Sequence, residues 1–355
     1  MTHGDRSRTL TPTALGVDTL GVDLFASADI DAGRARMLSV IRQLLEHRPA
    51  AGFEIPDDDG AVLDPAYFVY FSSPSPPFEL ADVARRVALR TPLRGTLTSL
   101  VAADHSGVWP LLEDWQHVID WDQTGASEAA LRVPLERAFR VLDQVQPRLS
   151  VAIRTTTRVV VSFAGEGPNS FAARSAHGAV FLNWRPGDGL PYAIEELAHQ
   201  GGHVLLTTIL FGVEEARFVV PPDSPMPRDL PNATSNLTPD PEDRTVLVML
   251  HAVVTEALMV MALGASLTAP ELTPIERHEV RGRLAYILHR FRDDLIDLLS
   301  AAVLSELGRE LVDNCRAVFE GAVERWLVSD RPLDLSGQPY AFCRQRFLSA
   351  NPLPG

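Results

Sequence analysis

The amino-acid sequence predicts a mainly α-helical protein with a small antiparallel β-sheet (α+β) and a metal site between helices. Apolar residues recur at helical spacing through several long segments, which is the pattern of amphipathic helices. One segment near the middle of the chain is rich in β-branched residues, which favour strands. After it, His199 and His203 stand four positions apart in a predicted helix.

Residues 1–148 are predicted to form a mostly helical N-terminal region. Residues 29–47 and 127–146 each carry apolar side chains at helical intervals. Residues 53–78 are rich in Pro, Asp and Ser, so we expect a loop there. Residues 79–113 have a mixed pattern that predicts no particular element.

The middle of the chain predicts antiparallel strands followed by a long helix. Two or three strands fit the short β-branched and apolar runs at residues 151–163 (VAIRTTTRVVVSF), 171–173 and 178–184 (GAVFLNW). A helix is expected over residues 190–211. Residues 221–243 contain too many prolines for one regular element, so they predict a loop that is either disordered or a cover for the active site.

The last third predicts three helices, over residues 246–269, 273–302 and 306–328. The second of them opens with Thr273 as N-cap, Pro274 in the first turn and Glu276 as the partner of a capping box. We interpret residues 149–330 as a metal-binding catalytic domain and residues 331–355 as a C-terminal extension.

Composition limits the classes of partner. A net charge of −14 over 355 residues argues against nucleic acid or a membrane surface, because phosphate-binding surfaces are normally basic. Two cysteines, Cys315 and Cys343, and no secretory signal pattern predict a cytoplasmic protein. Residues 246–269 could span a membrane by length, but they contain His251 and Glu256, so we expect a buried core helix. The oligomeric state stays open.

The pair of histidines is the clearest chemical signal. On a helix, His199 and His203 lie one turn apart on one face, and Glu196 shares that face. Such a pair suits two adjacent coordination positions of zinc or iron. Gly201 and Gly202 lie between the histidines and would allow another element to approach the helix closely.

A third ligand should come from another helix. Residues 246–269 offer His251 and Glu256, both costly to bury without a partner. Five positions on a helix correspond to about 140° of rotation, so at most one of the two faces the same ion. We rank His251 first and keep Glu256 as the alternative.

The region around the histidines resembles a known family. Hydrolytic zincins carry His-Glu-x-x-His, but this chain has Gln200 at the Glu position, and an amide cannot act as the general base. The segments GAVFLNW at 178–184, EELAHQGGH, and Leu-His-Ala at 250–252 instead resemble the HExxH-domain peptide-modification proteins. The resemblance covers roughly residues 150–300.

This resemblance implies an iron- and 2-oxoglutarate-dependent peptide β-hydroxylase. The implied metal ligands are His199, His203 and His251, with Glu256 or Glu196 as the carboxylate of a facial triad. Gln200 and Glu196 would lie at the reaction centre. The distal carboxylate of 2-oxoglutarate needs a cation, and among the arginines of residues 273–302 we choose Arg281, because it precedes Leu284 and Leu288 near the apolar stripe.

The sequence thus predicts a mononuclear non-haem Fe(II) oxygenase that hydroxylates a peptide or an amino-acid-derived natural product. The first alternative is a zinc hydrolase with a displaced base such as Glu196. The second is a non-catalytic binding protein on the HExxH scaffold. Gln200 favours the oxygenase and the binding protein over the hydrolase. The chain has no G-x-S-x-G, Walker or G-x-G-x-x-G motif.

Overall fold

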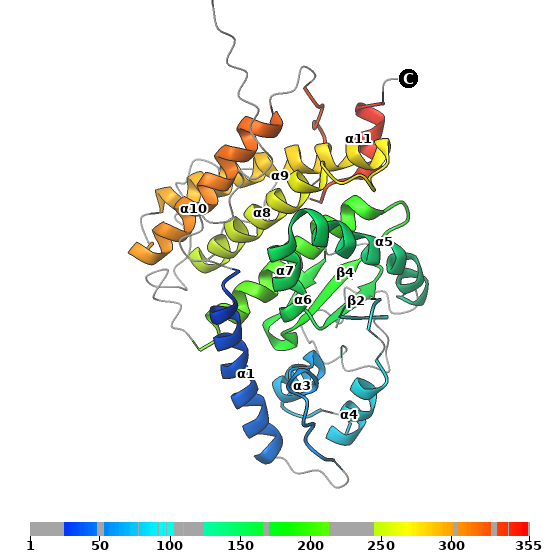
Figure 1. Ribbon diagram of the computed structural model, residues 1–355, viewed down its shortest axis with the longest axis vertical. Helices are drawn as coiled ribbons and strands as arrows, with labels where there is room; N and C mark the ends of the chain where they lie inside the picture. The colour runs from blue at the N-terminus through cyan, green and yellow to red at the C-terminus, as the bar shows by residue number, and fades with distance from the viewer. Residues whose placement is uncertain are drawn as a thin grey trace, which may run out of the picture.

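The chain is described from a computed structural model (Figure 1). The structure describes residues 25–47, 53–76, 78–90, 92–94, 96, 98–102, 109, 124–165, 170–212, 245–301, 304–327, 332–339 and 341–353. Its helices are α1 (Ser27–His47), α2 (Asp59–Val62), α3 (Pro65–Ser72), α4 (Leu80–Ala88), α5 (Thr124–Val145), α6 (Pro147–Thr156), α7 (Leu190–Leu210), α8 (Val246–Ser266), α9 (Pro274–Ser300), α10 (Glu306–Ala322) and α11 (Arg344–Ala350), with short turns η4 (Arg174–Ala176) and η7 (Val323–Leu327). The prediction of a mainly helical protein is therefore confirmed.

The strands of the described sheet are β1 (Ser99–Ala102), β2 (Val159–Phe163), β3 (Phe171–Ala172) and β4 (Ala179–Asn183). Their order is β1-β2-β4-β3; β1 and β4 both pair with β2 in parallel, and β3 runs antiparallel to β4. The predicted antiparallel sheet is therefore wrong, because this sheet is mixed. Between β2 and β4 the chain reverses twice, around β3, so β4 regains the direction of β2. The crossover from β1 to β2 runs through the helices α5 and α6, as parallel pairing requires.

The sheet separates two apolar cores. Because side chains alternate along a strand, Val160 and Val180 join the larger core, whereas Val159, Val161 and Phe181 join the smaller one. The smaller core lies against α1 to α4, and the larger one is shared with α5 to α10 (Figure 1). The larger core draws side chains from both sides of the boundary predicted at residue 148, and the division into domains stays a prediction.

Two segments that were predicted to be a loop and a strand contain helices instead. Residues 53–78 were expected to form a loop, but Asp64 accepts a hydrogen bond from the backbone N–H of Ala66 at 2.8 Å and caps α3, with Pro65 in the first turn. Residues 151–158 were expected to begin a strand but instead belong largely to α6. The reason is that Leu149 and Ile153, four apart, bury one helical face.

The predicted helices of the last two thirds of the chain are confirmed, including the capping box of Thr273 and Glu276 at the start of α9. The apolar helix α8 is long enough to cross a membrane, yet 83% of its apolar window is buried inside the protein, which is consistent with a core helix of a soluble protein. A cytoplasmic location stays a prediction. The proline-rich loop predicted at residues 221–243 lies outside the described residues.

The two glycines of α7 allow close packing on both sides. A Cβ added at Gly202 would lie 2.8 Å from Leu258 Cδ1 of α8, and one added at Gly201 would lie 3.0 Å from Ile153 Cγ2 of α6. Both values are shorter than ordinary contacts. The expectation that these glycines permit close approach is confirmed, and the elements that approach are α8 and α6.

Candidate functional site

Helices α7 and α8 bring three histidines together. His199 and His203 lie on one face of α7, and their ring centroids are 5.1 Å apart. His251 of α8 stacks on His203 with ring centroids 5.7 Å apart and an interplanar angle of 17°. The Nδ1 atoms of His203 and His251 are 3.5 Å apart. The close packing at Gly202 is what allows α8 to place His251 against α7.

All three imidazoles are neutral at physiological pH. Burial lowers the pKa of His203 to about 4, and burial together with the neighbouring His203 and Arg174 lowers the pKa of His251 to about 3. Burial, His203 and Arg290 also hold the pKa of His199 well below its ordinary value. Neutral imidazole is the form that binds a metal ion. The Nε2 atom of His251 is buried and has no hydrogen-bond partner among the described residues.

Glu256 lies away from the histidines. Its side chain is 1% exposed, and its Oε1 is 3.7 Å from the Arg290 Nη2 of α9. On the other side it lies near the buried Cys315, whose pKa is raised to about 12 by burial and by Glu256. The structure therefore brings His251, and not Glu256, beside His203. In the part of the chain that the structure describes, no group of three or more His, Cys, Asp or Glu side chains is arranged to hold a metal ion, so the metal site stays a prediction.

Glu196 and Gln200 form a buried pair next to His199. The Gln200 Nε2 donates to Glu196 Oε2 at 3.1 Å and to the backbone carbonyl of Ser170 at 3.2 Å, and it lies 3.0 Å from His199 Nδ1. Burial and the adjacent Glu195 raise the pKa of Glu196 to about 7, although the hydrogen bond from Gln200 opposes the rise. Glu196 can therefore hold or release a proton near neutral pH.

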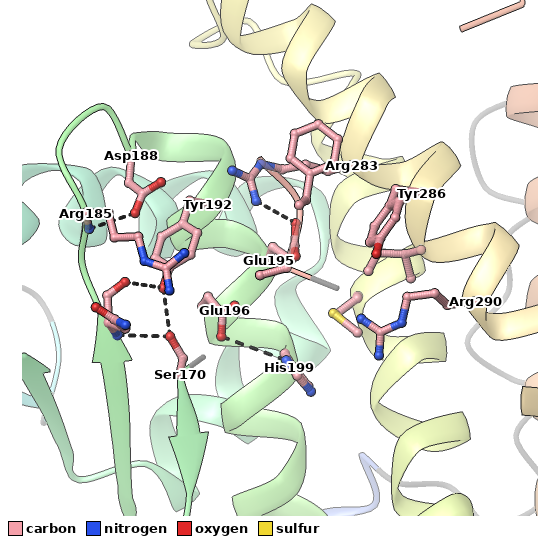
Figure 2. A pocket seen from close by; sticks show the side chains of 15 residues that line it. Ser170, Arg185, Asp188, Tyr192, Glu195, Glu196, His199, Arg283, Tyr286 and Arg290 are labelled. Atoms are coloured by element: carbon pink, nitrogen blue, oxygen red, sulfur yellow. Dashed lines mark hydrogen bonds and ion pairs between the residues drawn. The ribbon is translucent and has the colours of Figure 1, made fainter. Parts of the chain in front are cut away.

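Glu196 and His199 line a cavity between the start of α7 and the middle of α9 (Figure 2). It encloses about 600 Å³ of space, part of it open to solvent. Figure 2 shows Tyr192, Glu195, Glu196 and His199 on one side and Arg283, Tyr286 and Arg290 on the other. The lining residues are Ser170, Asn183, Arg185, Asp188, Tyr192, Glu195, Glu196, His199, Met259, Arg283, Tyr286, Ile287, Arg290, Ala341 and Phe342.

Tyr192 is a fixed wall of this cavity. Its hydroxyl donates to the carbonyl of Asn183 at 2.8 Å and lies 2.7 Å from Ser170 Oγ. Because a hydroxyl has one proton, Ser170 is the donor in the second bond. Burial raises the pKa of Tyr192 well above its ordinary value, with Glu196 and Asp188 adding to the rise. Tyr192 therefore ties the start of α7 to β4 and has no proton left for a ligand.

Arg283 is the most deeply buried cation of the cavity. It is 1% exposed and pairs with Glu195 of α7 at 3.0 Å and with Glu279 of α9 at 2.9 Å. These two carboxylates raise its pKa above the ordinary value, against the effect of burial. Its Nη2 atom is buried without a hydrogen-bond partner among the described residues. Arg283 thus places a positive charge in the lining of the cavity.

Arg281, the arginine chosen from the sequence, is exposed and does not line the cavity. Arg283 and Arg290 of the same helix do. The sequence analysis also missed Tyr192, and it missed Phe342 of the C-terminal segment. A usable signal existed for Arg283, since Glu279 precedes it by four positions, the spacing of a helical ion pair. No sequence signal placed residue 342 at this cavity.

The arrangement joins three features: neutral histidines, a carboxyl group that titrates near neutral pH, and a cavity lined by three arginines and three carboxylates. In general, neutral imidazoles are ligands for first-row metal ions, and guanidinium groups pair with carboxylates. In the comparisons with known proteins, no family model matches the chain and no curated protein sequence matches it.

Proposed function

We propose that this protein is a mononuclear non-haem Fe(II) enzyme that uses 2-oxoglutarate and hydroxylates a peptide or an amino-acid-derived natural product. The observation that carries the proposal is the cluster of His199, His203 and His251, whose first member lines a cavity that also contains arginines. Gln200 supports an oxygenase over a hydrolase, because its amide cannot activate water as a base.

The histidine cluster fits a metal ion chemically. All three rings are neutral, and the buried Nε2 of His251 finds no partner in the described part of the chain, which is costly unless something binds it. His199, His203 and His251 would hold the ion. Among the carboxylates, Glu196 is the nearest candidate for a further ligand, since its Oε2 is 3.8 Å from His199 Nδ1. Iron bound here would supply the redox chemistry of O₂ activation.

The other residues have separate tasks in this proposal. Arg283 takes the place that the sequence analysis gave to Arg281, because it lines the cavity and its Nη2 lacks a partner among the described residues. It would bind a carboxylate of 2-oxoglutarate, with Arg290 contributing positive charge next to His199. Gln200 holds the carboxyl group of Glu196 by a hydrogen bond and so fixes it beside His199.

The test begins with metal analysis of protein purified without added metal. We expect bound iron, and succinate formation from 2-oxoglutarate in the presence of O₂. His203→Ala and His251→Ala should each lose the iron while the far-UV circular dichroism is unchanged. The matched control is His289→Ala, because His289 is an exposed histidine of α9 outside the cluster. Full iron content in either cluster variant would contradict the assignment.

A zinc hydrolase is the second candidate, and one observation favours it. Glu196 has a pKa of about 7 and lines the cavity beside His199, so it could act as a displaced general base. This reading predicts bound zinc, no use of 2-oxoglutarate, and hydrolysis that Glu196→Gln abolishes. Protein that purifies without any metal, and that acquires none on incubation with Fe(II) or Zn(II), would favour a non-catalytic binding protein.

A further inference from the structure

The C-terminal segment, defined here as residues 332–339 and 341–351, is fixed to α9. Phe347 is fully buried, and its ring fills the space over Gly282, where an added Cβ would lie 2.4 Å from the ring. Arg344 Nε donates to Glu279 Oε2 at 2.8 Å. The hydroxyl of Tyr286 donates to the carbonyl of Pro339 at 2.8 Å. These contacts hold the segment before and after Ala341 and Phe342, which line the cavity.

Phe342 lies in that stretch and forms part of the cavity lining. Its ring stands 4.8 Å from the guanidinium carbon of Arg283, and the ring of Tyr192 stands 5.5 Å from the same carbon. Two aromatic faces, one from α7 and one from the C-terminal segment, thus contact this arginine. Phe342 also packs edge-on against Tyr286, with centroids 5.9 Å apart. The ring of Phe347 on α11 lies 5.3 Å from it, so rings on α9 and α11 hold Phe342 in position.

The fixed ring limits the space beside Arg283. Arg283 is itself immobile, since Glu195 and Glu279 hold it from two helices. A carboxylate that pairs with Arg283 from the cavity therefore has its position set, and the rest of the ligand must fit between this point and the neighbouring walls. Ala341 and Phe342 form the part of the wall that comes from outside the helical core.

We propose that the C-terminal segment is a wall of the ligand site and that Phe342 is a specificity-determining residue, which limits the length of the organic carboxylate bound at Arg283. This proposal rests on the proposed function for the identity of the ligand. It assigns a role in the site to residues that the sequence placed in a separate extension. The source of the carboxylate is either 2-oxoglutarate or the substrate to be hydroxylated.

The first experiment measures binding of oxaloacetate, 2-oxoglutarate and 2-oxoadipate, which differ by one methylene group each, to the protein as purified, under nitrogen, by calorimetry. We expect Phe342→Ala to improve the affinity for 2-oxoadipate relative to 2-oxoglutarate by about tenfold, the effect of one methylene group on fit. The matched control Leu353→Ala, an exposed residue of the same tail, should leave the ratio unchanged. An unchanged ratio in Phe342→Ala would overturn the proposal for Phe342.

A second experiment needs no ligand. Met259 lines the cavity and is 1% exposed, so a Met259→Cys variant, made with Cys343→Ser, reports access by its rate of reaction with N-ethylmaleimide. Cys315 is fully buried and stays. We expect Phe342→Ala to raise the rate about tenfold, in line with loss of the excluding wall. Gly282→Ala, which displaces Phe347, should raise it as well.

The two experiments separate the two proposals. If the wild-type protein binds none of the three oxoacids, yet a free amino acid from a panel of the twenty binds and its size preference changes in Phe342→Ala, the carboxylate comes from the substrate and the cosubstrate part of the proposed function fails. If no acid of either kind binds, the proposed function fails. The labelling rate alone then shows whether the C-terminal segment is a wall of the cavity. Equal labelling rates with and without the ring of Phe342 would refute the proposal that this segment is a wall of the cavity.

Discussion

His177 provides a quantitative test of the packing between the sheet and α7. It is 7% exposed, and its Nε2 lies 3.0 Å from Thr208 Oγ1 of α7. Thr208 already donates its only hydroxyl proton to the carbonyl of Val204 at 2.8 Å, so His177 must be the donor and carry its proton on Nε2. A second proton would create a buried charge, and burial accordingly lowers the pKa of His177 to about 4.

The lowered pKa makes the free energy of unfolding depend on pH. Below about pH 6.5 the unfolded chain binds a proton at His177 that the folded protein does not, so stability is full above this pH and falls as the pH drops towards 4, where the folded protein also binds the proton. The loss between about pH 7.5 and 5 is about 2 kcal/mol, and the total is about 3 kcal/mol.

The measurement is urea unfolding of the wild type and of His177→Gln over this pH range. The glutamine amide keeps a donor for Thr208 but does not titrate, and the other histidines contribute equally to both proteins. The difference in unfolding free energy should therefore change by about 2 kcal/mol between about pH 7.5 and 5, with the wild type losing more. Stability curves that stay parallel would refute this account of His177.

Three further variants test packing and charge. Gly33→Ala should destabilise the protein by about 3 kcal/mol in urea unfolding, because the new Cβ would lie 2.0 Å from the backbone oxygen of Thr208. Gly202→Ala gains about 1 kcal/mol of helix propensity but meets Leu258 Cδ1 at 2.8 Å, and since overpacking costs about 1–3 kcal/mol we expect a net loss near 1 kcal/mol. Arg283→Met should cost about 3–5 kcal/mol, because it leaves the buried Glu195 without its ion pair and Glu279 with Arg344 alone, and stability equal to that of the wild type would contradict this.

The helices were predictable because each carries a local signal. The capping box of α9 and the apolar run of α8 are visible in a few neighbouring residues. The direction of the strands was not, because it depends on how the chain travels between them. Ser99 of β1 pairs with Val159 of β2, although α5 and α6 lie between them in the sequence. Nothing in the sequence around residue 99 predicts this partner. Parallel pairing is a property of the connection and not of the strand.

The choice among the arginines of α9 failed for a related reason. Helix phase identifies an inward face only when one face is apolar, and α9 is buried on several sides at once: residues 279, 280 and 282–288 are all buried. Position in an apolar stripe therefore could not show which of Arg281 and Arg283 lines the cavity. The charge pattern was the better guide, since Arg283 has Glu279 four positions earlier and a further buried carboxylate, Glu195, next to Glu196 on α7.

The choice between His251 and Glu256 shows how much of a site helix geometry can predict. About 140° on one helix requires the two side chains to face different neighbours, and they do: His251 meets His203 of α7, whereas Glu256 meets Arg290 of α9. Rotation alone could not say which neighbour was which, because that depends on the side of α8 against which α7 packs. Gly202 determines this side, since its missing Cβ admits Thr255 and Leu258. On α8, Thr255 is one turn from His251, so the contact that Gly202 allows also turns His251 towards the histidines of α7. The glycine and the third histidine are thus two parts of one arrangement.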